Sequence, residues 1–504
     1  MSLLWPILKQ AFRAPRRVAV VDDFRQYTYP QLVGGAFFVA DAVQRASDRP
    51  HVGIMLPTTG AFPMAMLGVW LLGRTVAPVN YLLGRDELAY VLRDSDIDLL
   101  ITAGPLLDLV GGDQAIPPGI RILRIEEVDF TGFPRPRWPA RPRDEDPAVL
   151  LYTSGTSGKP KGVLLSHANL ESNVRASIQH AQLTRADAFL GVLPQFHTFG
   201  LTAMTLIPLF LRSRVIYTAR FIPKRIIELI REHQPDIFMA VPSMYGALLT
   251  AKDAGPDDLS SLRLLISGGE PLPDAVYENF EARFNLRILE GYGLTETSPV
   301  THWSTPDQHK RHSVGQPLPG VRTFILDEHD QPLPPGQVGE IAIGGPGVMI
   351  GYYKLPELTR EVLLELPDPG SGKPLRVFRT GDIGRVDEEG FLFITGRKKD
   401  MLIIGGENVF PREIEEVLNR HPAIHASAII GQLDTTRGEV PIAYVELAPD
   451  AELDATELRS FCRDHLAQFK VPREIHRVSE LPRSPTGKIL RRHLREDLQK
   501  GEER

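Results

Sequence analysis

The chain has 504 residues, more than the roughly 250–300 at which one hydrophobic core stops growing, so at least two domains are expected. Its hydrophobic fraction of 42% and charged fraction of 24% are ordinary for a globular protein, and a net charge of −6 argues against a nucleic-acid partner. The single cysteine, Cys462, excludes a disulfide framework within the chain and a cysteine-based metal cluster, and it fits a reducing compartment.

The sequence shows neither a targeting signal nor a membrane span. Residues 1–6 lack the charged start and apolar core of a signal peptide. The longest apolar runs, residues 61–73 and 198–211, are shorter than the ~20 residues that a spanning helix needs, so we expect them in the core. We therefore expect a cytoplasmic protein without a transmembrane segment, for which peripheral membrane contact stays open.

Strand-like and helix-like segments alternate over the first part of the chain. The expected strands are residues 18–21, 52–56, 76–79 and 99–102, and the expected helices are residues 29–44 and 61–72. This alternation is typical of a parallel α/β sheet. Residues 131–147 are rich in Pro and Arg and are expected to form a connector over the surface.

The most informative stretch is a hairpin whose loop suits an anion. Apolar runs at residues 148–152 and 162–165 predict a buried strand and its return strand. Successive backbone N–H groups in a glycine-rich loop form an anion-binding concavity, and hydroxyl and lysine groups strengthen it. The loop contains Thr153, Ser154, Gly155, Thr156, Ser157, Gly158, Lys159 and Lys161.

We expect this loop to hold a polyphosphate, with a mobile polar hairpin as the alternative. It is not the Walker loop, which needs Ser or Thr after Gly-Lys, because Lys159 is followed by Pro160.

The rest of the chain continues as α/β and then changes character. A helix is expected to begin near Ser166 or His167, and residues 237–241 predict a strand. From residue 315 to about residue 393, short β-like runs between Gly and Pro predict a small β-subdomain. A charged run at residues 397–400 marks a boundary, beyond which helix and strand alternate.

The expected fold class is therefore α/β. A large N-terminal domain, residues 1–398, is predicted to hold two α/β sheet subdomains and the β-subdomain. A small mobile α+β domain is predicted for residues 399–504.

A second informative stretch runs from residue 290 to residue 297. Gly291 and Gly293 let the backbone approach a flat ligand on which Tyr292 can stack. Thr295 can donate to a phosphate, and Glu296 is a hard oxygen ligand suited to Mg²⁺ bound to phosphate oxygens. A Gly-rich turn with a surface glutamate is the alternative.

Two shorter stretches place polar groups in turns. Asp382 follows Gly381 and can accept hydrogen bonds from both ribose hydroxyls, as acidic residues do in other nucleotide sites. Gly487 can turn the chain so that Lys488 projects. The alternatives are an Asx-turn for Asp382 and a solvated side chain for Lys488.

Together, these stretches resemble the adenylate-forming superfamily of acyl- and aryl-CoA synthetases, peptide-synthetase adenylation domains and luciferases. The resemblance extends from about residue 20 to Arg492 and is most specific in the phosphate loop. It implies ATP, Mg²⁺ and CoA as cofactors. It also implies that the phosphate loop encloses the β- and γ-phosphates.

The resemblance assigns further roles position by position. Gly268, Gly269 and Glu270 would line the adenine, on which Tyr292 stacks. Thr295 would touch the α-phosphate, Glu296 would bind Mg²⁺, and Asp382 and Arg397 would bind the ribose. Lys399 corresponds to the hinge between the domains, and Lys488 to the lysine that bridges the substrate carboxylate and the α-phosphate.

The implied chemistry agrees with these side chains. A carboxylate that attacks an α-phosphate brings negative groups together, and cations such as Mg²⁺ and Lys488 stabilise the charge that builds up. No protein nucleophile is needed, and we find no convincing serine triad or activated cysteine. Cys462 lies in a helix-like pattern and is expected to be a packing residue.

The substrate is expected to be a carboxylic acid without an α-ammonium group. His197 stands where the peptide-synthetase branch has the aspartate that pairs with this ammonium, and a buried ammonium without a partner is costly. In the acyl-CoA synthetase branch this position lies at the mouth of the acyl tunnel, and His197 joins Lys488, Thr295 and Glu296 in the catalytic group. A satisfied core histidine is the alternative.

The candidate acyl wall is mostly apolar, which favours a medium- or long-chain fatty acid over an aryl acid. It comprises Phe196, His197, Phe199, Ser243, Met244, Tyr245, Pro299 and Val300. In the second half-reaction, Gly405, Gly406 and Asn408 would shape the tunnel for the thiol arm of CoA.

The acceptor stays open between CoA and a separate acyl carrier protein. The family often has basic residues around Gly405, and this loop has none, which leaves Lys470 and Arg473 as weak candidates for the CoA phosphates. Two rivals from other classes are a catalytically dead nucleotide-binding scaffold and a simple ATPase. Intact Glu296 and Lys488 argue against the first, and carboxylate-dependent exchange of pyrophosphate into ATP would separate both from a ligase.

Overall fold

The computed structural model describes residues 3–135, 137–153, 159–434, 437–448, 451–452, 454–483 and 489–502. Six predicted site residues lie outside these ranges, namely Ser154, Gly155, Thr156, Ser157, Gly158 and Lys488. Within the described ranges, no helix has both the length and the apolar character needed to cross a membrane.

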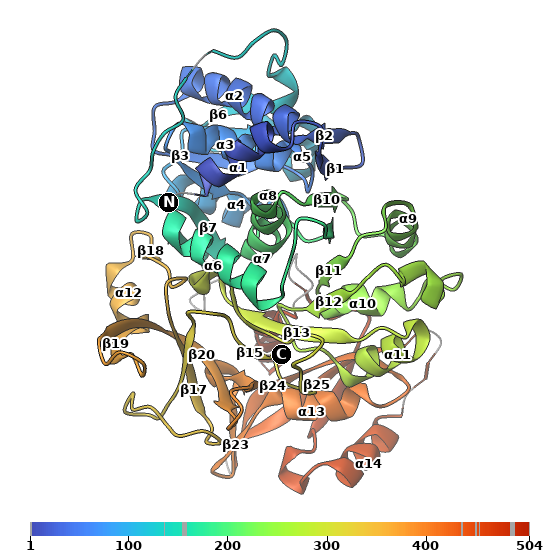
Figure 1. Cartoon of the computed structure of the whole chain (residues 1–504). Coiled ribbons are helices and arrows are strands. Elements are labelled where there is room, and N and C mark those ends of the chain that lie inside the picture. Colours follow the sequence, from blue (N-terminus) through green and yellow to red (C-terminus); the bar gives the residue numbers. More distant parts are fainter. Residues whose placement is uncertain are drawn as a thin grey trace.

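A seven-stranded sheet lies in the N-terminal part of the molecule, in the order β18-β8-β7-β4-β3-β5-β6 (Figure 1). Its strands are β3 (His51–Met55), β4 (Thr75–Pro78), β5 (Leu99–Thr102), β6 (Arg121–Arg124), β7 (Pro147–Thr153), β8 (Lys161–Ser166) and β18 (Gly351–Tyr352). Strands β3 to β6 are parallel to their neighbours, whereas β7 and β8 form an antiparallel pair. The parallel sheet and the predicted hairpin are both confirmed.

Helices pack on this sheet because their apolar residues are buried. These helices are α1 (Leu4–Arg13), α2 (Tyr29–Ala46), α3 (Ala61–Leu71), α4 (Arg85–Asp94) and α5 (Gly104–Val110), with short turns η1 (Asp113–Ala115) and η2 (Ile125–Glu127). Helix α3 is buried from Phe62 onward, as its apolar composition predicts. The indole N–H of Trp70 donates to the carbonyl of Ala148 at 3.0 Å, which fastens α3 to β7.

The predicted connector contains no helix or strand in residues 131–135 and 137–146, the part that the structure describes. Phe133 and Trp138 are 99% and 90% exposed. The connector is held to the body by an ion pair between Arg137 and Asp41.

A nine-stranded sheet follows, in the order β15-β14-β13-β12-β11-β9-β10-β1-β2. Its strands are β1 (Val18–Val21), β2 (Gln26–Thr28), β9 (Ala188–Gly191), β10 (Arg214–Tyr217), β11 (Ile237–Ala240), β12 (Leu264–Ser267), β13 (Ile288–Gly293), β14 (Val300–Trp303) and β15 (Gln316–Pro317). Six neighbouring strands of this sheet are parallel, namely β13, β12, β11, β9, β10 and β1. Their carboxyl ends therefore lie at the same edge of the sheet.

The helices packed around the nine-stranded sheet include the apolar run at residues 198–211, which forms helices in the core, as predicted. They are α6 (His167–His180), α7 (Thr198–Leu201), η3 (Thr202–Leu206), α8 (Ile207–Leu211), α9 (Pro223–His233), α10 (Pro242–Leu248), η4 (Pro256–Leu259), α11 (Asp274–Phe284) and η5 (Thr295–Thr297). Ser166 caps α6, since its Oγ accepts the backbone N–H of Asn169 at 3.1 Å. One continuous hydrophobic core includes residues of both large sheets.

The predicted β-subdomain is an antiparallel sheet of five strands. They are β16 (Arg322–Leu326), β17 (Gly339–Gly344), β19 (Leu363–Pro367), β20 (Pro374–Val386) and β21 (Leu392–Arg397), with helix α12 (Pro356–Val362) beside β19. The turn η6 (Lys398–Asp400) leads out of β21.

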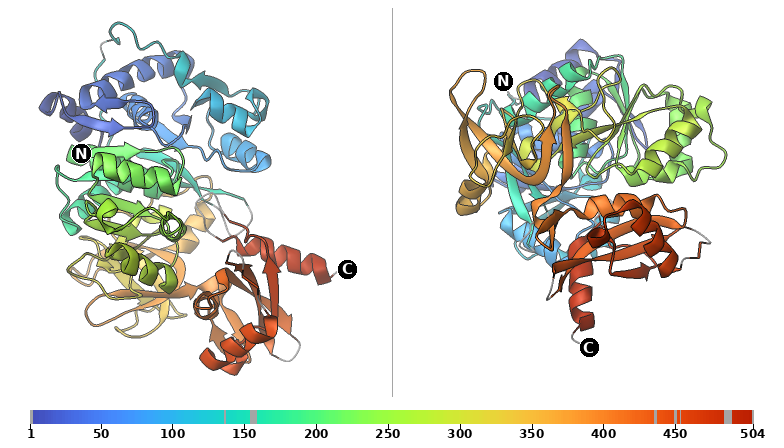
Figure 2. Two further views of the ribbon diagram at one scale, coloured as in Figure 1. Left: turned by 90° about the vertical axis from the view of Figure 1, so that its right-hand side faces the viewer. Right: turned by 90° about the horizontal axis from the view of Figure 1, so that it is seen from below.

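Residues 402–502, here called the C-terminal lobe, project from the rest of the chain (residues 3–397, the body), as Figure 2 shows in orange and red. The lobe contains β22 (Leu402–Ile404), β23 (Glu407–Val409), β24 (Ile424–Asp434), β25 (Gly438–Leu447), β26 (Glu474–Val478), α13 (Pro411–Asn419), α14 (Ala455–His465), η7 (Gln468–Lys470) and α15 (Arg491–Glu502). It has its own core, in which Cys462 is fully buried, as expected of a packing residue.

Candidate active site

The base of the phosphate hairpin is a pair of antiparallel strands. Thr153 at the end of β7 is paired with Lys161 at the start of β8. The Nζ atoms of the two predicted lysines lie over aromatic rings, Lys159 over Tyr90 at 5.6 Å and Lys161 over Tyr352 at 5.5 Å from the ring centroid. Such cation–π contacts hold an ammonium group while leaving its N–H donors available. The other loop residues, Ser154 to Gly158, lie outside the described part of the chain.

The predicted ribose-binding residues are brought together with the predicted stacking residue. Asp382 on β20 is 4% exposed, and its carboxylate lies 3.1 Å from Nε of Arg397 on β21. The hydroxyl of Tyr292 donates to Asp382 at 2.6 Å. Burial, followed by the Asp382 charge, raises the pKa of Tyr292 well above its ordinary value. Tyr292 is therefore a neutral donor to this carboxylate.

The predicted adenine-side glycines lie at the carboxyl end of β12. A Cβ on Gly268 would lie 3.1 Å from the ring of Phe199, so glycine lets this ring pack against the strand end. Gly269 has a φ of +86°, a left-handed conformation that favours glycine. Ligands of parallel α/β sheets bind beyond the carboxyl ends of their strands, which is where this turn lies.

Thr295 and Glu296 form a short turn, η5, between β13 and β14. Thr198 Oγ1 donates to Thr295 Oγ1 at 2.9 Å, which links this turn to the start of α7. Tyr352 donates to Glu296 Oε1 at 2.8 Å. Burial raises the pKa of Glu296, while the Tyr352 hydrogen bond and the charges of Arg397 and Lys161 oppose this effect. Glu296 therefore lies within the electrostatic reach of both the phosphate hairpin and the ribose pair.

The donor set around Glu296 fits Mg²⁺ that arrives with a nucleotide. Among the described residues, no group of three or more His, Cys, Asp or Glu side chains could enclose a metal ion. Mg²⁺ is usually held by one or two carboxylates together with phosphate oxygens and waters, and Glu296 supplies one such carboxylate.

The residues of the predicted acyl wall differ in exposure and in the contacts they make. His197 is exposed and accepts the backbone N–H of Phe199 through Nδ1 at 3.3 Å, so it caps α7. The ring of Phe196 packs edge-on against Tyr81 with centroids 5.0 Å apart. Pro299 and Val300 are buried beside Glu296, Met244 is half-buried, and Ser243 is exposed.

Tyr245 needs a correction, because it packs in the core. Its side chain is fully buried against the rings of Phe238 and Phe280, and its hydroxyl lies 3.0 Å from the carbonyls of Phe238 and Ile266. A tyrosine whose polar end is satisfied by strand backbone has a structural role, and we do not retain it in the proposed wall.

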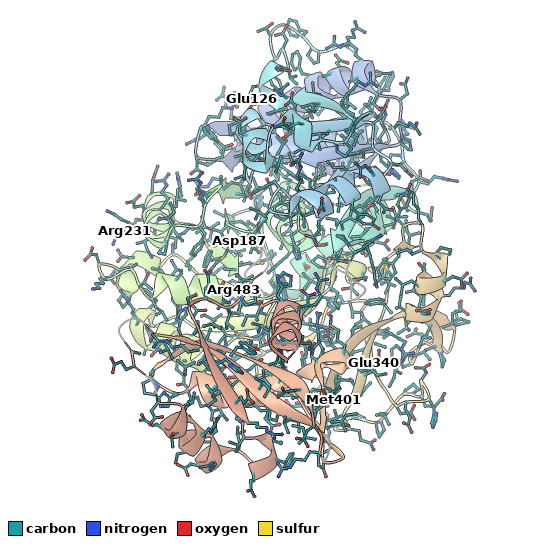
Figure 3. All side chains as sticks on the ribbon, turned by 180° about the vertical axis from the view of Figure 1, so that it is seen from behind. Glu126, Asp187, Arg231, Glu340, Met401 and Arg483 are labelled. Atoms are coloured by element: carbon teal, nitrogen blue, oxygen red, sulfur yellow. The ribbon has the colours of Figure 1, made fainter. Side chains whose placement is uncertain are left out.

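The residues predicted for the hinge and the CoA tunnel lie on either side of β22. Lys399 is the middle residue of η6, whose neighbour Lys398 contacts Glu340 at 2.9 Å. Figure 3 labels Glu340 and Met401 near this turn. Gly405 and Gly406 form the tip of the β22–β23 hairpin with φ values of +62° and +89°, and Asn408 is exposed on β23.

Residues 483 and 489 flank the segment that contains Lys488. Arg483, labelled in Figure 3, forms an antiparallel bridge with Ile489, and Lys488 itself lies outside the described residues. Next to this bridge, Arg491 contacts both oxygens of Glu415 at 2.8 and 2.7 Å. The Glu415 charge raises the pKa of Arg491, to which Asp400 and Glu270 also contribute. Arg491 therefore lies within the electrostatic reach of Glu270 in the adenine-side turn.

Three contacts of the site were not predicted from the sequence: the hydrogen bond from Tyr352 to Glu296, the ion pair of Arg491 with Glu415, and an ion pair of Arg420 with Asp274. Each joins residues far apart in the chain, so no local pattern indicates them.

The chain is similar to known proteins along most of its length. A family model described as "AMP-binding enzyme" matches residues 7–353, and one described as "AMP-binding enzyme C-terminal domain" matches residues 413–488. A long-chain-fatty-acid–CoA ligase of Bacillus subtilis (strain 168) is 33% identical, over 97% of this chain and 93% of that protein.

Other relatives differ in the acid or the acceptor that their names give. A feruloyl-CoA synthase of Amycolatopsis sp is 32% identical, over 97% of this chain and 98% of that protein. A fatty acid–[acyl-carrier-protein] ligase, ScoC, of Streptomyces coeruleorubidus is 32% identical, over 96% of this chain and 93% of that protein.

Solved structures match over nearly the full chain. ATP-bound MatB from Rhodopseudomonas palustris has a TM-score of 0.88 at 28% identity, with 99% of both chains covered. Apo MatB has a TM-score of 0.77 with the same coverage. Over the whole chain, the similarity in fold is thus greater to ATP-bound than to apo MatB.

Proposed function

We propose that this chain, which belongs to the AMP-binding enzyme family, joins a medium- or long-chain fatty acid to the thiol of CoA. It is an AMP-forming acid–thiol ligase that uses ATP, Mg²⁺ and CoA. A carboxylate oxygen bonds to the α-phosphorus of ATP while the bond to the β-phosphate oxygen breaks, which releases pyrophosphate. The thiol then loses its proton, its sulfur bonds to the acyl carbon, and AMP leaves.

One observation carries the proposal for the site. The half-buried Glu296 carboxylate accepts a hydrogen bond from Tyr352, over whose ring Lys161 of the phosphate hairpin lies, and the charges of Lys161 and of Arg397 in the ribose pair act on it. A triphosphate bound along the hairpin, with its ribose at Asp382, would therefore pass Glu296 near its α-phosphate. We assign Lys159, Lys161 and the loop residues from Thr153 to the β- and γ-phosphates.

The other nucleotide contacts follow from this placement. Asp382 and Arg397 would bind the ribose, and the turn of Gly268, Gly269 and Glu270 would line the adenine. Tyr292, between Gly291 and Gly293, would stack on the base and hold Asp382 through its hydroxyl.

Glu296, with Thr295 beside it, is the proposed metal-binding position. Mg²⁺ held there would neutralise phosphate charge as pyrophosphate separates. The protein's own part is to orient the Glu296 carboxylate through Tyr352, and to place Thr295 where its hydroxyl can donate to the α-phosphate.

We assign to Lys488 the role of neutralising the negative charge of the attacking carboxylate. We propose that the C-terminal domain, residues 399–504, brings this lysine to the site and then turns about Lys399, so that the thiol can enter past Gly405, Gly406 and Asn408. The predicted N-terminal domain, residues 1–398, would stay fixed. Rotation about a few residues at the end of an element is an ordinary way to move a domain.

The fatty acid assignment depends on the apolar wall. Phe196, Phe199, Met244, Pro299 and Val300 offer no charged partner, and His197 at their edge is exposed. An apolar wall of this kind suits an alkyl chain. An aryl acid or transfer to a carrier protein is the second candidate, favoured by the names of two relatives. A cytoplasmic location, where ATP and CoA are supplied, stays a prediction.

The experiment is a panel of acids in pyrophosphate–ATP exchange, followed by thioester formation with CoA or a carrier protein. Fatty acids of eight to sixteen carbons should support exchange, and CoA should then be consumed. Exchange with ferulate or benzoate alone would replace the fatty acid assignment with the aryl one. Exchange that needs no acid, or none with any acid, would contradict the ligase.

A further inference from the structure

Tyr352 contacts Glu296, the predicted metal ligand. The sequence predicts no role for Tyr352. Its hydroxyl donates to Oε1 of Glu296 at 2.8 Å. The backbone N–H of Met349, three residues earlier, donates to the carbonyl of Glu296 at 2.9 Å. Both the main chain and the side chain of Glu296 are therefore fastened to one short segment.

This segment is itself part of the phosphate-hairpin sheet. Tyr352 lies on β18 and is paired with Val163 on β8, two residues beyond Lys161. The Tyr352 backbone N–H donates to Oγ1 of Thr359 at 2.9 Å, which fixes β18 to α12. The position of the Tyr352 hydroxyl is thus set by the pairing of β18 with β8, the strand that follows the phosphate loop.

The hydrogen bond has a chemical consequence for the carboxylate. The terminal torsion of a glutamate is broad, so an unheld carboxylate samples many orientations. With Oε1 engaged by a neutral donor, Oε2 keeps its full capacity to ligate a cation. Partners that hydrogen-bond to a ligating group typically change metal affinity or activity 10- to 100-fold when removed.

We propose that Tyr352 is a positioning residue for metal binding, whose hydroxyl orients the Glu296 carboxylate toward the divalent cation of the nucleotide complex. This inference rests on the proposed function only in taking Glu296 as the metal ligand. It adds a residue from a distant strand to the site and couples the metal position to the phosphate hairpin.

The structure supplies a clean variant and a matched control. Tyr352→Phe removes the hydroxyl but keeps the ring over which Lys161 lies, so the cation–π contact is retained. Tyr353→Phe removes the neighbouring hydroxyl, which donates to Asp96 at 2.7 Å instead of to Glu296. Thr359→Val removes the support of the Tyr352 backbone and leaves its hydroxyl in place.

The direct test is Mn²⁺ binding followed by electron paramagnetic resonance, with the full chain and α,β-methylene-ATP. Tyr352→Phe should weaken Mn²⁺ binding about tenfold, in the range expected for such partners. Tyr353→Phe should stay within about twofold of the wild type, since a hydroxyl that does not touch Glu296 has no effect on its orientation. In exchange assays, the Mg²⁺ concentration for half-maximal rate should rise for Tyr352→Phe, while its rate at saturating Mg²⁺ recovers.

Three results would overturn the inference. Mn²⁺ affinity of Tyr352→Phe equal to that of the wild type would remove the role of the hydroxyl. An equal loss in Thr359→Val would assign the effect to the strand, and a large fall in the unfolding temperature of the nucleotide-free Tyr352→Phe protein would make it structural. Because metal binding is measured without turnover, failure of the ligase assignment would be seen separately, as a wild type that binds Mn²⁺ but activates no acid.

Discussion

Nη2 of Arg420, which follows α13, lies 3.1 Å from Oδ2 of Asp274 at the start of α11, so an ion pair connects the C-terminal lobe to the body. Asp274 is 8% exposed and also pairs with Arg311 of the body. The Asp274 carboxylate is therefore held by Arg311 of the body. Arg420 of the lobe forms a second ion pair with it. This contact belongs to the arrangement of body and lobe that the structure has.

Arg420→Ala should slow formation of the acyl-adenylate by up to about fivefold, because a partly exposed ion pair contributes roughly 0.2–1 kcal/mol to the arrangement that contains it. Thioester formation from isolated acyl-adenylate should be unchanged or faster. Rapid-quench single turnovers of the two half-reactions measure this difference.

The matched control is Arg231→Ala, which removes an ion pair with Asp258 on the body, away from the lobe. Its two half-reactions should both match the wild type. Equal slowing of both steps in Arg420→Ala would mean that the ion pair does not distinguish the two arrangements.

Asp382→Asn should weaken ATP binding about tenfold or more, because hydrogen bonds to a charged group contribute roughly 1.5–3 kcal/mol. If the carboxylate accepts from the ribose hydroxyls, the wild type should bind ATP much more tightly than 2′-deoxy-ATP, and the variant should lose most of this preference. Calorimetric titration with both nucleotides gives the two ratios. Asp387→Asn is the matched control and should keep the wild-type preference for ATP over 2′-deoxy-ATP. An unchanged preference in Asp382→Asn would mean that the ribose binds elsewhere.

Acid should destabilise the protein through His302, which is fully buried between the hydroxyls of Thr301 and Thr323. Burial lowers the pKa of His302 to about 3, whereas an unfolded histidine has a pKa of about 6.5. Between these values the unfolded chain binds a proton that the folded chain does not. The free energy of unfolding should therefore fall as the pH drops from about 6.5, by up to ~1.4 kcal/mol per pH unit.

Urea unfolding at pH 7.5, 6 and 5 measures this dependence. His302→Gln should have a smaller pH dependence than the wild type, and His329→Gln, whose side chain is 78% exposed, should not. Equal slopes in the wild type and His302→Gln would show that the buried ring is not the group that titrates.

The sequence was sufficient for the framework of the fold because its strands are continuous apolar runs. Residues 99–102 were predicted as a strand and form β5, and the runs on either side of the phosphate loop form β7 and β8. The β-subdomain was visible from Gly and Pro spacing. The sequence could not show that β1 leaves its neighbours and pairs with β10 in the second sheet, since strand order depends on long-range packing.

The site was predictable where its residues are close in sequence, and much less so elsewhere. Thr295 and Glu296 follow a recognisable glycine turn, but the partner of Glu296, Tyr352, is 56 residues away. Tyr245 was predicted as part of the mostly apolar acyl wall, next to Ser243 and Met244 in the sequence. Its helix turns the ring into the core instead, and a single sequence does not show on which face of a short helix the cavity lies.

Lys488→Ala should abolish acyl-adenylate formation, with a loss of at least about a hundredfold, because one preorganised group at the site of developing charge contributes a factor of this size. ATP binding should stay within about threefold of the wild type. Lys252→Ala, on the surface of the body, is the control and should have the activity of the wild type. Undiminished adenylation in Lys488→Ala would remove this residue from the mechanism.

The central claim is that the acid's own oxygen attacks the α-phosphorus, and isotope transfer tests it most directly. Palmitate with both carboxylate oxygens labelled with ¹⁸O would be converted with ATP, Mg²⁺ and CoA, and the AMP would be examined by mass spectrometry. The account predicts that each AMP carries one ¹⁸O. Unlabelled AMP, or release of ADP and phosphate in its place, would contradict it.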